Sequence, residues 1–452
     1  MLDGDPRAAL YPRGPSDPAH AWARAGVPTH AMDYLIVVEA RCYEVGPGRF
    51  VTESAFAEHL RRLRRMLGAR FERIVVAAPS YSAEFYEANR SHLGELREEV
   101  DEITYLPLYR DDASVGRYWT REAGRIVPAL WRQVGRSSVV HSGLAHDVAR
   151  PTPFLAILFA IVRRRPSIFF VDIDFRDKAR MHRILGDWSA RSYWICRGLL
   201  DPLRRIQVWL AVRMCSLCLL KSARLVADYG RGRPNVRDFF NTAHSAEHVI
   251  SDARMAGKLE RVRDPAEPLT LVYFGRFVHY KGLDRTLHAV DSARRRSGRP
   301  LRLLLIGDGD QRAALEQRID ALGAGDWATI REPIPFGPDL FERLYDCALA
   351  VGTPLVEDTP RAAFDAMAAG LPTVAFDIAY YRDLEETGAV VTSPWPDPEA
   401  LAGRILELEA DRERLADMAA RAVAVARANT QEIWLERRVR WTRELLDAPA
   451  PA

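Results

Sequence analysis

The feature that most constrains the fold is an alternation of strand-like and helix-like segments, which occurs in two separate halves of the chain. Strands alternating with helices indicate parallel sheets, because each helix carries the chain back before the next strand begins. The expected strands lie at 33–40, 71–79, 137–143 and 167–175 in the first half, and at 269–277, 301–309, 346–354 and 371–377 in the second. We therefore expect an α/β protein with two Rossmann-like domains whose parallel sheets face a central cleft.

The domain limits follow from the segments between these patterns. Residues 261–268 are charged and contain prolines, which is typical of a linker. They separate an N-terminal domain, 33–260, from a C-terminal domain, 269–429. Residues 1–32 contain no apolar core segment, so we expect a mobile tail rather than a signal peptide. Residues 430–452 contain a closing helix with enough apolar residues to pack against the first domain.

Composition narrows the class of protein. A net charge of +3 over 452 residues is too small to indicate nucleic-acid binding. Five scattered cysteines suit a reducing cytoplasm. Cys215 and Cys218 lie in an apolar helical run with no second pair at metal-ligand spacing, so buried thiols are expected and no metal site. The longest apolar run, 154–162, is too short to span a bilayer, which leaves a cytoplasmic or membrane-peripheral protein.

Two carboxylates lie eight positions apart near the end of the third strand of the second half. Thr359 is a good helix N-cap and Pro360 suits the first helical position. Glu357 is therefore expected in the loop after the strand, and Asp365 in the following helix. Ligands bind at this edge of an open parallel sheet, and helix N-termini attract phosphate. The layout predicts a nucleotide-sugar site with Glu357, Thr359 and Asp365 among its residues.

Asp365 also has a plainer interpretation. It could pair with Arg361 on a solvated helix face, which stabilises a helix only weakly. The rest of the helix is nearly all apolar, however, so we expect it to be buried. A buried carboxylate needs a partner, which favours a role in binding.

A phosphate site is predicted where the first strand of the second half ends, in the sequence GRFVHYKG. Arg276 offers a planar fork for bidentate contacts and Lys281 a compact charge. Gly275 permits close backbone approach and Gly282 precedes the next helix. Two surface cations would be the ordinary alternative. The glycines and the downstream carboxylates favour a diphosphate site.

Two glycine-containing segments add weaker signals. Gly307, Asp308 and Gly309 form a tight turn after a strand and support the same nucleotide site by their order in the chain. Gly46 and Gly48 bracket a proline after the first strand of the chain. They suit either a phosphate loop or an ordinary turn.

Polar residues also follow two strands of the first half. His141 ends one strand and His146 lies in the adjoining loop, and either could be a ligand contact or a buried histidine. Asp172, Asp174 and Arg176 alternate along the next strand. They suit either acceptor recognition or a local ion pair.

The stretch TPLVEDTPRAAFDAMAAGLPTVAFD resembles the E-x7-E signature of family 4 retaining glycosyltransferases of group 1, which have the GT-B fold. GRFVHYKG resembles that family's G-R-x4-K-G. The resemblance implies that Arg276 and Lys281 neutralise the donor pyrophosphate, that Glu357 contacts the donor sugar, and that Asp365 holds the ribose. Asp365 is one methylene shorter than the family's usual Glu.

The resemblance implies further roles in the first half. His141 would lie at the reacting sugar, and the loop with Gly46 and Gly48 would approach the donor phosphate and the acceptor. The last helix would cross back to the first domain. The implied reaction is transfer of a hexosyl-type sugar from a UDP- or GDP-sugar, with retention, to a glycan, lipid-linked or cell-surface polysaccharide intermediate. No cofactor or metal is expected, because no D-x-D lies at the phosphates.

Two other functions remain open at this point. A GT-B nucleotide-sugar epimerase would act on the donor alone. A catalytically inactive scaffold would bind a nucleotide without transfer or hydrolysis, and the short Asp365 is its best argument.

Membrane contact is the last open question. Helix 54–67 carries four arginines beside an apolar face, which suits either an anionic membrane surface at the inner face of the plasma membrane or a solvated helix. Residues 192–220 place aromatic residues near arginines. They suit a membrane-facing or acceptor-facing insertion, or packing within the domain.

Overall fold

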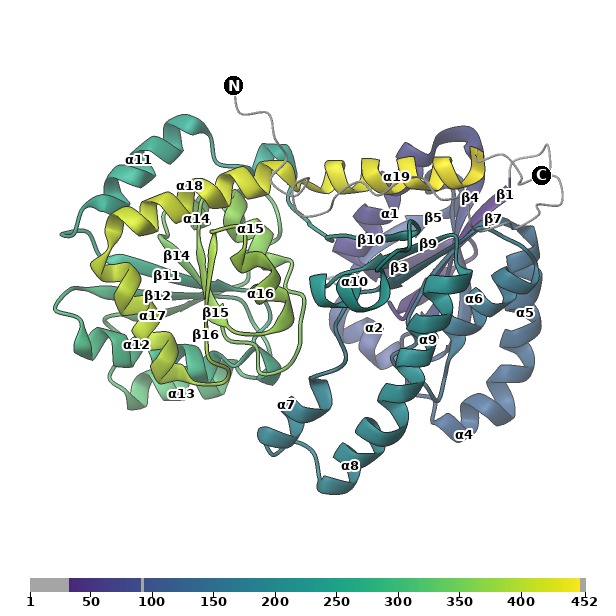
Figure 1. Ribbon diagram of the computed structural model, residues 1–452, viewed down its shortest axis with the longest axis horizontal. Coiled ribbons are helices and arrows are strands. Elements are labelled where there is room, and N and C mark those ends of the chain that lie inside the picture. The colour runs from purple at the N-terminus through teal and green to yellow at the C-terminus, as the bar shows by residue number, and fades with distance from the viewer. Residues whose placement is uncertain (1–31, 91–92, 448–452) are drawn as a thin grey trace.

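A computed structural model describes residues 32–90 and 93–447, and Figure 1 shows two α/β halves, with the last two helices lying one along each half. The strands of the first half are β1 Met32–Val37, β2 Cys42–Gly46, β3 Arg49–Glu53, β4 Phe71–Ser80, β5 Leu93–Arg97, β6 Ile103–Arg110, β7 Ser137–Gly143, β8 Ser167–Val171, β9 Leu217–Leu220 and β10 Val236–Asp238. Its helices are α1 Ser54–Leu67, α2 Ala83–Asn89, α3 Glu98–Asp101, α4 Val115–Arg117, α5 Ala123–Arg136, α6 Thr152–Val162, α7 Lys178–Ile184, α8 Ala190–Ile195, α9 Asp201–Met214 and α10 Ala223–Tyr229.

The second half continues the numbering. Its strands are β11 Leu269–Phe274, β12 Leu301–Ile306, β13 Ala328–Arg331, β14 Leu349–Gly352, β15 Thr373–Phe376 and β16 Val390–Ser393. The remaining helices are α11 Asp252–Arg263, α12 Leu283–Arg296, α13 Arg312–Ala321, α14 Pro338–Tyr345, α15 Ala362–Ala368, α16 Ala379–Glu385, α17 Pro398–Ala410, α18 Arg412–Ala428 and α19 Gln431–Asp447.

The second sheet is parallel throughout and has the order β13-β12-β11-β14-β15-β16. Alternate residues of β11 enter different cores, since Leu271 packs in one cluster and Val272 in another. The order reverses between β11 and β14, so the loops that follow these two strands diverge there. A crevice at such a switch point is where ligands bind in open parallel sheets.

The first sheet is parallel along β10-β9-β8-β7-β1-β4, with β6 added beside β4. The prediction of a parallel sheet is confirmed there. An antiparallel group, β2-β3-β5, extends the sheet beyond β4. Of the two interpretations of Gly46 and Gly48, the ordinary turn is confirmed, because β2 and β3 pair as a hairpin on either side of it.

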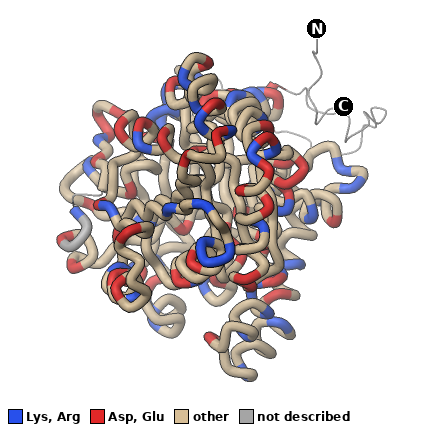
Figure 2. The backbone as a smooth tube through the Cα atoms, turned by 90° about the vertical axis from the view of Figure 1, so that its left-hand side faces the viewer, with Lys and Arg blue, Asp and Glu red and all other residues tan. Residues whose placement is uncertain are grey.

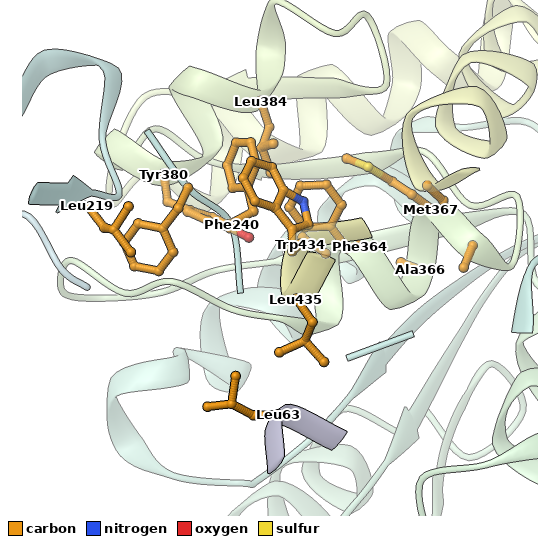
Figure 3. Close-up of a cluster of buried hydrophobic side chains, with 14 of the residues drawn as sticks. Leu63, Leu219, Phe240, Phe364, Ala366, Met367, Tyr380, Leu384, Trp434 and Leu435 are labelled. Atoms are coloured by element: carbon orange, nitrogen blue, oxygen red, sulfur yellow. The ribbon is translucent and has the colours of Figure 1, made fainter. Parts of the chain in front are cut away.

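The two halves share one hydrophobic cluster, shown in Figure 3. Trp434 of α19 lies 5.6 Å from Phe240 between ring centroids, and Phe240 lies 5.0 Å from Phe364 of α15. Helix α19 then continues onto α1, where Arg62 pairs with Glu432 at 2.9 Å. The expected crossing of the last helix to the first domain is confirmed.

Helix α11 packs on the second half, although we assigned residues 252–260 to the first. The Nζ of Lys258 donates a hydrogen bond to the carbonyl of Ala369 at 2.7 Å. Met255 packs with Val423 of α18. The expected linker, 261–268, therefore begins inside this helix. The expected tail lies outside the described residues, apart from Met32.

Candidate functional site

A cavity of about 580 Å³ lies at the carboxyl ends of β11 and β14, at the switch point of the second sheet. It is called the donor cavity below. The sequence-predicted residues Gly275, Arg276, Lys281 and Asp365 line it together. Phe336, Leu340 and His248 supply an apolar and aromatic side.

Hydrogen bonds and a close backbone approach hold the two loops of the donor cavity together. Gly282 has φ +65°, and a Cβ there would lie 2.2 Å from the carbonyl oxygen of Thr353. The hydroxyl of Thr353 donates to the Gly282 carbonyl at 2.9 Å. The amide of Leu355 donates to the Tyr280 carbonyl at 2.8 Å. These contacts bring the GRFVHYKG segment and the carboxylate segment into one site.

The two cations of the cavity have different surroundings. Arg276 is exposed, and its Nη2 donates to the Tyr280 hydroxyl at 3.0 Å. Lys281 is half-buried and forms an ion pair with Asp358, which also lines the cavity. We did not predict Asp358, although an acid directly after Glu357 was the available signal. Its carboxylate occupies the place at Lys281 that a ligand phosphate would need.

Asp365 is buried at the donor cavity, and its Oδ1 has no hydrogen-bond partner among the described residues. The nearest ionisable group is the Nδ1 of His244 at 3.9 Å. His244 donates through Nε2 to the Ala426 carbonyl at 2.9 Å, which leaves Nδ1 without a proton. Burial raises the pKa of Asp365 to about 7, against a smaller lowering by Arg361. A buried acceptor of this kind suits a ligand hydroxyl.

Helix α15 begins later than predicted. It starts at Ala362, and its N-cap, Arg361, makes no side-chain capping bond. The prediction of Thr359 as the N-cap is therefore wrong. The contacts of Thr353 and Leu355 hold the preceding chain against the other loop, so the turn into the helix comes further along the chain. Thr359 lines a second cavity instead of the donor cavity.

Glu357 lies beside the donor cavity without lining it. Its two carboxylate oxygens accept from the amide of Ala379, the first residue of α16, at 3.2 and 3.3 Å. Burial raises the pKa of Glu357 to about 7, and the Ala379 amide opposes that rise. Its neighbours in sequence differ from it, because Asp358 lines the donor cavity and Thr359 lines the second cavity.

The Gly307–Gly309 turn supports the donor cavity from behind. A Cβ on Gly307 would lie 1.9 Å from the Gly275 carbonyl oxygen, and one on Gly309 would lie 2.4 Å from that of Phe277. Asp308 is exposed and accepts from the Gly309 amide at 2.8 Å. None of the three lines the cavity, so their glycines serve close packing of the Arg276 loop.

The second cavity, of about 440 Å³, lies between the halves and is called the acceptor-side cavity below. Three sequence candidates line it: His141, His146 and Asp172. His141 is buried, and its Nδ1 lies 3.1 Å from the Tyr34 hydroxyl. Burial lowers the pKa of His141 well below its usual value, so its imidazole is neutral. Burial likewise lowers the pKa of His146 to about 4.

The three charged residues after β8 were expected either to recognise an acceptor or to form a local ion pair, and they differ in which of these they fit. Asp172 lines the acceptor-side cavity. Asp174 and Arg176 form a buried ion pair, with Nε to Oδ1 at 2.8 Å. All three lie in the loop after Val171 and not on the strand as we expected.

Sequence reasoning missed two cations of the acceptor-side cavity. Lys221 follows β9, is buried, and has its Nζ 5.7 Å from the centre of the Tyr380 ring. Arg438 comes from α19, and its Nη1 lies 3.0 Å from the Nε2 of His59. Among the described residues neither cation has a carboxylate within 4.0 Å. Burial lowers the pKa of both.

Gly46 and Gly48 do not form a phosphate loop. They flank the turn of the β2–β3 hairpin, where Gly48 has φ +65° and its carbonyl accepts from the Glu98 amide at 2.8 Å. Neither lines either cavity. Glu39 and Ala40, shortly after β1, line the acceptor-side cavity in their place. The alternation of apolar residues on both sides of the turn was the signal for a hairpin.

The described residues contain neither a metal-ligand cluster nor a membrane-spanning helix. Within residues 32–90 and 93–447, no group of three or more His, Cys, Asp or Glu side chains is placed to hold a metal ion. All five cysteines are buried free thiols. No helix in the described part of the chain is long and apolar enough to span a bilayer.

Comparison with known proteins gives a family match for part of the chain and a fold match for nearly all of it. Residues 258–424 match the family described as Glycosyl transferases group 1. The whole described chain has the GT-B fold of solved glycosyltransferases. Among them is Anabaena HepE in complex with UDP, at 17% identity and a TM-score of 0.59, covering 91% of this chain and 100% of that one.

Two further structures show how widely the fold is used. WaaG, a glycosyltransferase involved in lipopolysaccharide biosynthesis, has 13% identity and a TM-score of 0.58, covering 92% of this chain and 100% of that one. A putative UDP-N-acetylglucosamine 2-epimerase from Listeria monocytogenes has 13% identity and a TM-score of 0.55, covering 94% of this chain and 99% of that one. No curated protein matches the sequence. These likenesses show the fold, which transferases and epimerases share.

Proposed function

We propose that this protein is a retaining, family 4 glycosyltransferase that moves a sugar from a UDP- or GDP-sugar to an acceptor. The observation that carries the proposal is the convergence of Arg276, Lys281 and Asp365 on one cavity at the switch point. Those three residues lie in the segment that matches the group 1 glycosyltransferases. HepE has been solved with UDP and with UDP-glucose, which supports a uridine donor.

Charge at the donor diphosphate is the main chemical requirement. As the glycosidic bond breaks, negative charge develops on the leaving diphosphate, and Arg276 and Lys281 stabilise it. Lys281 exchanges its ion pair with Asp358 for the phosphate oxygens when the donor binds. Asp365 accepts from a ribose hydroxyl, and Phe336 lies against the base. These cations take the part that a metal has in other transferases, so no metal is expected.

Glu357 orients the donor sugar from beside the donor cavity. In the free protein its oxygens face the first amide of α16, and a sugar hydroxyl adds a second donor that favours the carboxylate. His141 lies across the cleft as a neutral imidazole and positions the reacting sugar by hydrogen bonding. Retention follows from the leaving phosphate helping to deprotonate the acceptor on the same face.

The acceptor occupies the acceptor-side cavity. Lys221 is buried and Arg438 half-buried in its lining, and neither has a carboxylate partner among the described residues, which suits an acceptor that carries a phosphate or diphosphate. A lipid-linked or cell-surface glycan intermediate meets that description. The reaction then takes place in the cytoplasm, where nucleotide sugars are made.

A thermal-shift panel of nucleotide sugars tests the proposal, because a ligand raises apparent stability by mass action. We expect one UDP- or GDP-sugar to raise the Tm, and Lys281→Ala to abolish the rise. Arg296→Ala is the matched control, since this exposed cation at the end of α12 also pairs with an acid, Glu399, but does not line the donor cavity. Equal shifts in the wild type and the Lys281 variant would contradict the phosphate assignment.

Two measurements separate the alternatives. An epimerase converts the donor without acceptor, so sugar analysis of donor incubated alone with the protein distinguishes it. A scaffold binds the donor yet produces neither transfer nor slow hydrolysis. The anomeric configuration of the product, measured by NMR, then decides whether the reaction retains or inverts.

A further inference from the structure

The exposed apolar side chains of this protein are concentrated in one segment. Thirteen large apolar side chains are exposed in the described part of the chain, and seven of them lie between residues 184 and 209. In Figure 1 the helices of this segment, α7 to α9, project below the body of the first half. Contiguous apolar surface on a projecting element indicates an interaction site.

Five of these side chains form a continuous face. Helices α8 and α9 are joined by one π-helical turn, Cys196–Leu200, into a single helical rod. Along it the exposed residues recur every three or four positions, which places them on one side of a helix. We call this face the exposed stripe: Ile195, Leu199, Leu203, Ile206 and Trp209. It is about 21 Å long at the usual helical rise.

The fold does not need the exposed stripe, because the opposite face of the rod already supplies the packing. Val208, Ala211 and Val212 are buried in a core cluster of the first half. The same face is tied to the acceptor-side cavity. Arg204 donates to the His146 carbonyl at 2.8 Å, and Gln207 accepts from the Ala145 amide at 3.1 Å. The rod is therefore rigidly placed relative to that cavity.

Positive charge is concentrated in the same segment of the chain. Residues 178–214 contain eight basic and two acidic side chains, a net of +6, while the whole chain has +3, which leaves −3 for the remainder. Arg191, Arg197 and Arg205 are exposed and form no ion pair with another described residue. The guanidinium of Arg213 lies 3.9 Å from the centre of the Trp209 ring. In Figure 2 these helices are the lowest part of the molecule, and blue segments interrupt the tan.

Helix α1, whose sequence suits either a membrane surface or a solvated face, differs in this respect. Its arginines are already engaged: Arg61 pairs with Asp101 at 3.0 Å and Arg62 with Glu432 at 2.9 Å. Arg64 is buried and donates to the Gly68 carbonyl at 2.7 Å. The exposed face is also reduced by α19, which packs on it. The charges of α1 thus serve packing within the first half and, through Arg62, contact with α19.

We propose that the exposed stripe docks this protein on an anionic lipid bilayer. Leucine and isoleucine enter the boundary between headgroups and acyl chains, tryptophans lie at that boundary, and flanking arginines attract anionic lipids. Trp194 and Trp209 lie near the two ends of the stripe. A second copy of the chain fits less well, because two stripes would bring two sets of unpaired arginines together.

Docking has a consequence for the acceptor that rests on the proposed function. Arg204 and Gln207 hold the loop of residues 144–147 through its backbone, so the acceptor-side cavity is kept at a fixed position relative to the membrane. A lipid-linked acceptor would then reach the cavity without leaving the bilayer.

Vesicle flotation of the full-length protein tests the docking. We expect the wild type to float with vesicles of phosphatidylcholine and phosphatidylglycerol, much less with phosphatidylcholine alone, and less at high salt. The stripe variant Ile195→Ser/Leu199→Ser/Ile206→Ser should bind about tenfold more weakly or worse. The charge variant Arg191→Gln/Arg197→Gln/Arg205→Gln should lose the preference for anionic lipid.

Matched controls keep the outcome clear. Val100→Ser/Val162→Ser removes exposed apolar side chains elsewhere and should float like the wild type. The stripe variant should keep its thermal shift with nucleotide sugar, so lost docking is distinguishable from a failed donor site. Wild type that stays unbound, or a stripe variant that floats as well, would overturn the proposal. So would wild-type dimers in sedimentation that the stripe substitutions dissociate.

Discussion

The two cavities of the cleft differ in how their charges are balanced. In the donor cavity Lys281 has an internal counter-ion, Asp358. In the acceptor-side cavity Lys221 and Arg438 have no carboxylate within 4.0 Å among the described residues. The donor cavity therefore keeps its lysine paired until a ligand displaces the acid, while its exposed Arg276 donates to the Tyr280 hydroxyl. The acceptor-side cavity holds a buried lysine and a half-buried arginine at a cost to stability, which is characteristic of functional sites.

The largest effect is expected when Lys281, the paired cation of the donor cavity, is replaced. Lys281→Ala should weaken UDP or GDP binding by about 100-fold, because a charge-assisted contact to phosphate is lost and Asp358 is left unpaired. Isothermal titration of the nucleoside diphosphate measures the loss. The matching nucleoside, which has no phosphate, should bind the variant and the wild type equally.

Glu357 links the cleft to the pH dependence of stability. Its pKa rises from an ordinary 4.5 to about 7 in the folded protein, so the folded state binds the proton more tightly. This carboxyl should therefore make the free energy of unfolding of the ligand-free protein fall as pH rises from 4.5 to about 7, with no further fall above that. Glu357→Gln should make this slope shallower and stabilise the protein by about 1–3 kcal/mol at pH 8.

Thermal unfolding over this pH range measures the effect. Asp308→Asn is the matched control, because it neutralises an exposed acid outside both cavities and should leave the slope unchanged. Transfer activity should be lost in Glu357→Gln while its stability rises. A variant less stable than the wild type at pH 8 would show that the carboxylate serves the fold rather than the sugar.

The donor cavity was largely predictable from sequence, whereas only His141, His146 and Asp172 of the acceptor-side cavity were. Gly275, Arg276 and Lys281 lie within one short segment at a strand end, where local pattern and position specify the chemistry. Lys221 and Arg438 meet only after a strand of one half and the last helix of the chain are packed together. No local pattern marks them, and neither has a partner nearby in sequence.

Tertiary contacts also decided what local sequence left open or predicted wrongly. Gly46 and Gly48 were compatible with a turn or a phosphate loop, and the pairing of β2 with β3 decided for the turn. Thr359 had the right residue type for an N-cap, but contacts of Thr353 with the Gly282 loop delay the helix start. For Thr359, tertiary contacts thus overrode a sound local preference.

A smaller effect tests whether Asp358 keeps Lys281 paired until the ligand binds. Asp358→Asn should strengthen nucleoside diphosphate binding by about tenfold, because it removes a negative charge beside the phosphate and frees Lys281. Titration of UDP or GDP at two salt concentrations measures it. Weaker binding in this variant would mean that Asp358 positions Lys281 for the phosphate.

The smallest expected effect concerns the acceptor-side cavity. Lys221→Met keeps the side-chain length and removes a buried charge that has no carboxylate partner among the described residues, so it should raise the Tm by about 2 °C. Nucleotide-sugar binding should not change, since Lys221 does not line the donor cavity. Transfer to a phosphate-bearing acceptor should fall through a higher KM. A variant that is more stable yet transfers normally would show that Lys221 does not bind the acceptor. The unpaired charge of the acceptor-side cavity would then affect the stability of the protein and not its function.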